Sequence, residues 1–220
     1  SAASDVYKRQ EVYTFKKLLM LLFACILLTG CFSSPQNDAI TDFSSIPKTK
    51  FNYKNLKNRA DMSAYYTLED ENHAFTDMSL ETFYNKLTTS KKTLSGAFYF
   101  GYDDCPYCKQ AVPILNYVAK EYNATVSYVN IFSSRYDENG NKLENGDKYY
   151  TELQAYLDEY LDKEDKTIYV PTVIFIKNGQ ISLYQLGLDT DENFDIKKGL
   201  NIKGKNNLAE IYRKGFNSIK

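Results

Sequence analysis

Apolar residues recur along the chain with two different spacings, and these predict alternating strands and helices. Over Ser79–Thr89 they fall at helical spacing, and Ser79 is a suitable N-cap residue. The run SGAFYFGY at 95–102 is short and almost continuously apolar, which is typical of a central strand covered on both faces. Apolar positions at i, i+3, i+4 and i+7 within 111–122 then predict a helix that begins near Cys105.

The second half of the chain continues the alternation. We expect a strand over 124–132, a helix over 149–161, two strands within 172–187 joined by the turn Asn178-Gly179, and a last helix over 207–219. With a first strand around His73, the predicted order is β-α-β-α-β-α-β-β-α. This order indicates an α/β fold with a central mixed sheet and helices on both of its faces.

The N-terminal part has a different character. Lys16-Lys17 precedes the apolar run Leu18–Thr29, which is shorter than the roughly 20 residues that a membrane-spanning helix needs but matches the apolar region of a signal peptide. The run leads into Leu28-Thr29-Gly30-Cys31, which resembles the lipobox of bacterial lipoproteins. This resemblance implies lipidation at Cys31 and export to the outer face of the cell membrane.

We therefore expect three regions. Residues 1–30 are a signal peptide, and their first part, 1–14, fits poorly and is expected to be a non-native leader or a misread start, because Asp5 and Glu11 stand where basic residues belong. Residues 31–60 are polar and aperiodic, which predicts a flexible, lipid-anchored tether. Residues 61–220 are expected to form the folded domain.

Charge and cysteine usage narrow the function. The formal net charge is −1, so nothing in it indicates a nucleic-acid partner, and we expect no cofactor. Of the four cysteines, Cys25 leaves with the signal peptide and Cys31 carries the lipid, so Cys105 and Cys108 remain in a compartment where disulfides persist.

The segment Cys105-Pro106-Tyr107-Cys108 follows a predicted strand and opens a predicted helix. The unpaired N–H groups and the positive end of the helix both favour a thiolate at the first cysteine, and Pro106 costs no helical hydrogen bond. Asp103 and Asp104 oppose the thiolate and Lys109 favours it, so we expect these carboxylates to tune its reactivity.

Two other interpretations of the pair stay open. A zinc site needs four ligands, and beyond the two thiols the chain after Cys31 offers only His73, which has no motif around it and is expected to be a solvated strand residue. A permanent structural disulfide is the second, although its closed loop is too short to constrain much of the chain.

Three features in order resemble the thioredoxin-like superfamily: CPYC after an apolar strand, Pro113 five residues past the second cysteine, and VPT at 170–172 before a strand that ends in KNG. The resemblance implies a cis peptide bond before Pro171, on a loop that faces the cysteines. It also implies that Val170, Pro171 and Tyr107 contact substrate, with the backbone of Val170 pairing with an extended segment. The general layout is similar to the lipoprotein thioredoxins of Gram-positive bacteria, including bacteriocin transport accessory proteins.

The chain also departs from that family. The best-known thioredoxins have a buried aspartate six residues before the first cysteine, where this chain has Tyr99, and a tryptophan where it has Asp104. The stretch 133–168 is longer than in the minimal fold and predicts a helical insertion before the strand that follows Pro171.

We expect an extracytoplasmic thiol–disulfide oxidoreductase, with Cys105 exposed and attacking and Cys108 resolving. Its partners are expected to be exported proteins with thiols or disulfides, a membrane redox protein that recycles the pair, and the membrane through the lipid. The alternative is a thioredoxin-fold lipoprotein that binds a partner at the cell surface, accessory to export or surface assembly, without catalysis.

Overall fold

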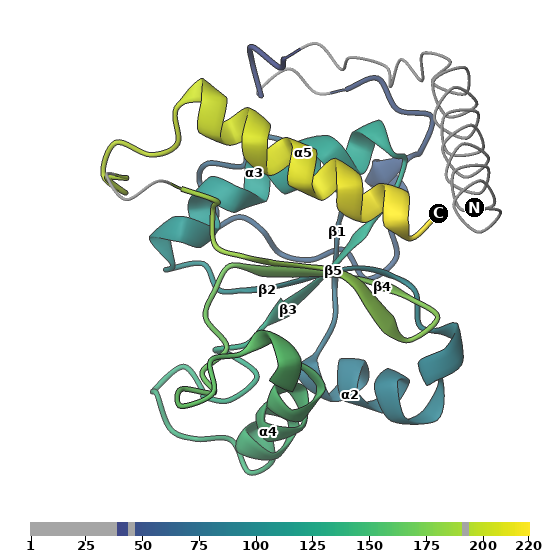
Figure 1. Cartoon of the computed structure of the whole chain (residues 1–220), viewed down its shortest axis with the longest axis vertical. Helices are drawn as coiled ribbons and strands as arrows, with labels where there is room; N and C mark the ends of the chain where they lie inside the picture. The colour runs from purple at the N-terminus through teal and green to yellow at the C-terminus, as the bar shows by residue number, and fades with distance from the viewer. Residues whose placement is uncertain (1–38, 44–46, 191–193) are drawn as a thin grey trace, which may run out of the picture. The chain divides into compact units, whose positions relative to one another are not determined.

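The computed structural model describes residues 39–43, 47–190 and 194–220 (Figure 1). Within them five strands form one sheet in the order β1-β3-β2-β4-β5. The strands are β1 (Phe75–Asp77), β2 (Gly96–Gly101), β3 (Val126–Asn130), β4 (Thr172–Lys177) and β5 (Gln180–Leu186). β1, β2 and β3 run parallel, β4 pairs antiparallel with β2, and β5 pairs antiparallel with β4. The predicted mixed sheet is confirmed, and the architecture is thioredoxin-like.

Two pairs of helices cover the sheet, one pair on each face (Figure 1). α3 (Pro106–Glu121) and α5 (Ile202–Ser218) pack on one face, and α2 (Leu80–Thr89) and α4 (Gly146–Tyr156) pack on the other. Because β2 and β3 run parallel with α3 between them in sequence, this part is the predicted βαβ unit. The predicted order of strands and helices is confirmed throughout the described residues.

β2 shows why its sequence is apolar almost without interruption. Successive side chains of a strand point to opposite faces. Ala97 and Tyr99 therefore lie in the core beneath α3 and α5, whereas Phe98 and Phe100 lie in the core beneath α2 and α4. All four are buried, so both faces of the central strand contribute to a core.

The hairpin between β4 and β5 turns at the predicted dipeptide. Asn178 and Gly179 have φ values of 53° and 77°, the left-handed region that such a turn requires. Gly179 is also needed for space, since a Cβ there would lie 2.1 Å from the carbonyl oxygen of Lys91. The turn is thereby held against the segment that leads into β2.

Two helices begin earlier than the periodicity indicates. α5 starts at Ile202, because the Asn201 side chain accepts a hydrogen bond from the N–H of Gly204 and so caps the helix ahead of the predicted start at residue 207. α4 starts at Gly146 and ends at Tyr156, after which Leu157 and a short 3₁₀ turn complete the predicted insertion. The insertion packs on α2, so it belongs to the core of that face.

The compact unit begins at Ile40, which corrects the expected boundary at residue 61. The backbone of Ile40 exchanges two hydrogen bonds with the side chain of Asn206 on α5, at 2.7 and 2.8 Å. The Tyr53 hydroxyl donates to the carbonyl of Ala124 at 2.8 Å, and Arg59 bridges to Thr76 of β1. Ile40, Tyr53 and Ala60 are buried, so the later part of the expected tether is part of the domain; the expected signal peptide and Cys31 lie outside the described residues.

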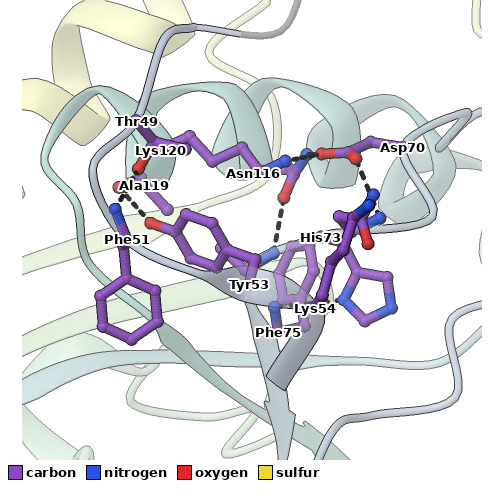
Figure 2. A network of polar contacts seen from close by, with 12 residues as sticks. Thr49, Phe51, Tyr53, Lys54, Asp70, His73, Phe75, Asn116, Ala119 and Lys120 are labelled. Carbon is purple, nitrogen blue, oxygen red and sulfur yellow. Dashed lines mark hydrogen bonds and ion pairs between the residues drawn. The ribbon is translucent and has the colours of Figure 1, made fainter. Parts of the chain in front are cut away.

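A buried polar group joins this N-terminal segment to α3 (Figure 2). We call Asp70, His73, Asn116 and Lys120 the charged cluster. Asp70 forms an ion pair with Lys120 and accepts a hydrogen bond from Asn116 at 2.9 Å, while Asn116 accepts from the N–H of Ala74 at 2.8 Å. His73 is only 6% exposed, so the prediction of a solvated residue is wrong: the Arg59 guanidinium donates to its Nε2, and its ring contacts that of Phe75.

Among the residues that the structure describes, no helix has both the length and the apolar character needed to cross a bilayer.

Candidate active site

Cys105 is the N-cap of α3, as the sequence predicts. Its backbone is extended, with φ −73° and ψ 116°, and Pro106 begins the helix. The Cys105 Sγ accepts a hydrogen bond from the N–H of Cys108 at 3.1 Å. The sulfur therefore occupies the place that a serine or aspartate oxygen takes at other helix N-termini, where donors converge and negative charge is favoured.

The surroundings of Cys105 lower the pKa of its thiol from 9 to about 7. The main cause is a hydrogen bond from the Cys108 thiol; burial opposes it, and the N–H groups of Cys108 and Tyr107 and the charge of Lys109 add to it. At neutral pH about half of the sulfur is then thiolate, the form that attacks disulfides.

Cys108 has the opposite environment. Cys108 is fully buried, and this burial raises the pKa of its thiol well above the ordinary value, with Cys105 adding to the rise and Tyr99 opposing it. The two cysteines are free thiols. The pair is thus asymmetric, with one sulfur that ionises at neutral pH and one that stays protonated.

The exposure of Cys105 differs from the expected open sulfur, since only 4% of the residue is accessible. The sulfur lies at the side of a cavity of about 470 Å³ between the start of α3 and the stretch 131–136 and 167–170. Three large aromatic side chains at this cavity are exposed, namely Tyr107 at 41%, Phe132 at 50% and Tyr169 at 56%. A partner would reach Cys105 through this cavity, which we call the aromatic groove.

The loop before β4 completes the groove on its other side. The peptide bond between Val170 and Pro171 is cis, as the resemblance implies. The Cys105 thiol donates to the carbonyl oxygen of Val170 at 3.7 Å, so this loop faces the cysteines. Tyr107, Val170 and Cys105 line the same cavity, which brings together residues that are 65 positions apart in the sequence.

The carboxylates before Cys105 lie in the turn that follows β2. Asp103 is half-buried and Asp104 is exposed. Burial raises the pKa of Tyr128 and of Tyr102, and the charge of Asp103 adds to the first rise and that of Asp104 to the second. A tuning effect of either carboxylate on Cys105 stays a prediction.

A larger cavity, of about 610 Å³, runs along the outer side of α3 past Asp70 and Tyr117 and includes neither cysteine. Within the described part of the chain no three His, Cys, Asp or Glu side chains come together as metal ligands. Of these two cavities, the aromatic groove is the one that Cys105 lines.

Periodicity alone missed several residues that shape the site. Phe132, Arg135 and Tyr150 reach the groove from the insertion, where Arg135 lies 3.9 Å from the ring centre of Tyr150 and pairs with Asp147. Tyr65 and Tyr128 are buried in the same core cluster as Cys108. The one signal for them is the unusual excess of tyrosine, 20 residues with no tryptophan, and it names no position.

Residues 54–155 match the model of the family described as TraF, F plasmid transfer operon protein, which is a thioredoxin-like family. The matched stretch contains α3 and both cysteines and ends before Val170 and Pro171. No curated protein matches the chain. The family match and the sheet agree on a thioredoxin-like domain built around the cysteine pair.

Proposed function

We propose that this protein is a thiol–disulfide oxidoreductase. The observation that carries the proposal is the asymmetry of the pair: Cys105 caps α3 with a pKa of about 7, whereas Cys108 is buried with a raised pKa. An exchange enzyme needs one sulfur that attacks and a second that waits, and this arrangement supplies both.

In the direction of reduction, the Cys105 thiolate attacks one sulfur of a substrate disulfide. A Cys105–substrate disulfide forms, the substrate bond breaks, and the other substrate sulfur leaves as a thiolate. Cys108 then attacks Cys105, which closes the Cys105–Cys108 disulfide and expels the second substrate thiolate. Oxidation of a substrate dithiol is the reverse, so the reduction potential of the pair decides the direction.

The aromatic groove supports an extended polypeptide as the substrate. The Val170 carbonyl lies next to the Cys105 sulfur, in position for backbone pairing with a strand-like segment. Tyr107, Phe132 and Tyr169 present apolar surface beside that line. We propose that Tyr107, Val170 and Pro171 contact substrate and that apolar residues flank the substrate cysteine.

We also propose that the protein acts outside the cytoplasmic membrane, anchored by lipid at Cys31. The dibasic stretch, the short apolar run and the sequence LTGC support this. Its partners are then exported proteins with thiols or disulfides, and a membrane redox protein that recycles the pair after each exchange. A Cys31→Ser variant should move from the membrane fraction to the soluble exported fraction.

One observation favours a second function, a binding module without catalysis. Cys105 is only 4% exposed, so a partner must enter the aromatic groove before the Cys105 sulfur can contact it. A module would use the same groove to hold a partner while the cysteines stay unused.

Thiol trapping at controlled redox potentials tests the proposal. We expect one reversible two-electron couple, with a potential between about −270 and −120 mV, the range of known exchange proteins. A Cys108→Ser variant should accumulate mixed disulfides with exported proteins, and a Cys105→Ser variant should accumulate none. If Cys108→Ser traps nothing while the protein still binds a partner, the binding module replaces the enzyme.

A further inference from the structure

The insertion contributes a cation to the aromatic groove. Among the described residues that line the groove, Arg135 is the one whose side chain carries a permanent charge, and the others are apolar, aromatic, a thiol or a hydroxyl. The Arg135 side chain is 24% exposed, so it lies partly covered at the surface of the groove. A polypeptide segment that enters the groove therefore meets one fixed positive charge within a largely apolar surface.

Two aromatic rings hold the Arg135 side chain in place. Its guanidinium carbon lies 3.9 Å from the ring centre of Tyr150 and 5.2 Å from that of Tyr136, which are cation–π distances. Tyr150 is buried, and its hydroxyl accepts a hydrogen bond from the N–H of Ile168 at 2.9 Å. The ring that carries the guanidinium is thereby tied to the loop that contacts Cys105.

The backbone of Arg135 is fixed as well. Its carbonyl accepts a hydrogen bond from the N–H of Leu143 at 2.8 Å, next to the bridge between Tyr136 and Lys142. A Cβ at Gly146 would lie 2.6 Å from the Arg135 Cα, so the start of α4 packs directly against this residue. Arg135 is therefore a rigid part of the groove, which reduces the entropy lost when it binds a partner.

The charge of Arg135 is only partly neutralised by its neighbours. Its Nε and Nη2 both donate to a single oxygen of Asp147, at 3.4 and 3.1 Å, and the other oxygen of Asp147 pairs with Lys142 at 2.7 Å. One carboxylate thus faces two cations, and a positive charge remains. Asp103 and Asp104, the carboxylates next to Cys105 in sequence, are not among the residues that line the groove.

We propose that Arg135 is a specificity-determining residue, which selects polypeptide substrates with an aspartate or glutamate close to the reacting cysteine. The inference rests on the proposed function, because it names the kind of polypeptide that the aromatic groove accepts. A guanidinium binds a carboxylate through charge-assisted hydrogen bonds, and the attraction is stronger where apolar surface excludes water. Phe132 and Tyr169 supply such surface in the same groove.

The size of the groove limits where this carboxylate can lie. A cavity of about 470 Å³ is roughly 10 Å across, and an extended chain advances about 3.3 Å per residue. With the substrate sulfur at Cys105, the acidic residue therefore lies within about three positions of the substrate cysteine. An apolar wall follows this distance toward Arg135, with ring centres 5.9 and 5.2 Å apart along Tyr102, Phe132 and Tyr136.

A series of short peptides tests the inference. Each peptide has one cysteine, present as a disulfide with 2-mercaptoethanol, and both of its ends are blocked so that only a side chain can supply a carboxylate. Glutamate or glutamine, which have the same shape, stands at one of the three positions on either side of the cysteine. The Cys108→Ser protein cannot resolve the bond, so mass spectrometry follows the rate at which the peptide becomes attached to Cys105.

The measured quantity is the ratio of the glutamate rate to the glutamine rate. With Arg135 present we expect this ratio to reach roughly 3 to 10 at one position, an effect between that of an exposed ion pair and that of a hydrogen bond to a charged group. It should shrink toward 1 when the salt concentration rises from about 0.01 M to about 1 M, because the screening length falls from about 30 Å to about 3 Å.

Variants made in the Cys108→Ser protein assign the preference to one side chain. Arg135→Gln should lower the ratio to about 1, and a general loss of activity does not change a ratio. Lys148→Gln is the matched control, because it removes a positive charge from an exposed position on the same insertion outside the groove, and it should keep the ratio. Arg135→Lys keeps the charge without the planar guanidinium, so its ratio should lie between these, and it gives a second readout if Arg135→Gln does not fold.

Different results overturn different statements. If peptides become attached to Cys105 but glutamate gives no faster reaction at any position, the inference is wrong and the proposed function stands. If Arg135→Gln keeps the ratio, or Lys148→Gln lowers it as much, the preference does not come from a contact with Arg135 and the inference is again wrong. If no peptide disulfide reacts with Cys105, the proposed function itself fails and the inference fails with it.

Discussion

The two ends of α3 are buried against polar side chains of different kinds. Near its first turn the same core cluster as Cys108 holds three buried tyrosines, Tyr65, Tyr99 and Tyr128, whose hydroxyls are hydrogen-bonded to one another; we call them the tyrosine chain. About two to three turns further on, Asn116 and Lys120 contact Asp70 in the charged cluster (Figure 2). Both groups are hydrogen-bonded, and each includes a residue of the segment that precedes β1, Tyr65 in one and Asp70 in the other.

The difference lies in what each group can do without disturbing the fold. A buried ion pair holds its geometry, because moving a proton, or separating the two charged side chains, leaves an uncompensated charge in a medium of low dielectric constant. A row of phenols can reverse its hydrogen bonds at little cost, since no member becomes charged. The charged cluster therefore suits a structural role, whereas the hydroxyls of the tyrosine chain can reorient without leaving a charge buried.

The strongest way to break this comparison is to remove one charge of the cluster. Asp70→Ala leaves the Lys120 ammonium buried without its partner, so we expect the free energy of unfolding to fall by about 3–5 kcal/mol. Urea unfolding measures the loss, and Glu69→Ala, at the exposed neighbouring position, is the control. The Asp70→Ala protein that stays folded should still exchange disulfides as wild type does. A folded variant that cannot exchange would contradict the structural role of the charged cluster.

The second-largest effect is expected at acid pH, where the charged cluster should lose stability. Burial, with the charge of Arg59 adding to it, lowers the pKa of His73 from 6.5 to about 4. Between these pH values the unfolded chain binds a proton that the folded protein excludes, so the free energy of unfolding falls as the pH falls, by roughly 1–3 kcal/mol. Asp70, whose pKa is lowered by Lys120 and Asn116 against its burial, extends the loss below that range.

Chemical unfolding at a series of pH values measures this effect. A His73→Asn variant keeps an acceptor for the N–H of Phe75 and removes the titration, so its stability should vary much less over the same interval. An unchanged slope in the variant would assign the pH dependence to another group.

At the other end of α3, attack by Cys105 should follow the titration of its thiol. Since the pKa is about 7, the rate at which Cys105 attacks a small disulfide should rise about tenfold per pH unit below pH 7 and level off above it. Measurement of that rate from pH 5 to 9 tests this. A midpoint near the ordinary value of a free cysteine would mean that neither the Cys108 thiol nor the N–H groups of the helix end activate Cys105.

The smallest effect is expected where a buried hydroxyl belongs to neither group. Tyr212→Phe removes a hydroxyl without a partner, so the free energy of unfolding should stay within about 1 kcal/mol of wild type or rise slightly. Tyr65→Phe removes a hydroxyl bonded to two others and should cost more. Equal stabilities in thermal unfolding would mean that the hydrogen bonds of the tyrosine chain add nothing to the fold.

Much of the fold follows from local pattern. Ser79 caps α2, Cys105 caps α3 and Asn178-Gly179 turns the hairpin, because caps and turns depend on residues a few positions apart. The cis bond before Pro171 follows from the resemblance alone.

What the sequence does not reveal depends on contacts between distant residues. Ile40 and Tyr53 are isolated apolar residues that pack with side chains of α3 and α5. Because they belong to no repeating apolar pattern, the sequence does not predict their burial. The burial of His73 and of Cys105 likewise depends on segments more than ten residues away. The sequence marks Tyr99 as a departure from the family. It does not reveal the contacts of Tyr99 and Tyr128 with Tyr65, because these form only when three separate segments come together.

The pairing of Ile40 with Asn206 also limits the distance between the folded unit and the proposed attachment point. If Cys31 carries the proposed lipid, the chain from Cys31 to Ile40 can span at most roughly 30 Å, against about 100 Å for the whole of residues 31–60. Under that proposal the domain would stay within this distance of the membrane and would meet partners that emerge beside it, so lengthening the chain ahead of Ile40 is a direct way to change which partners it meets.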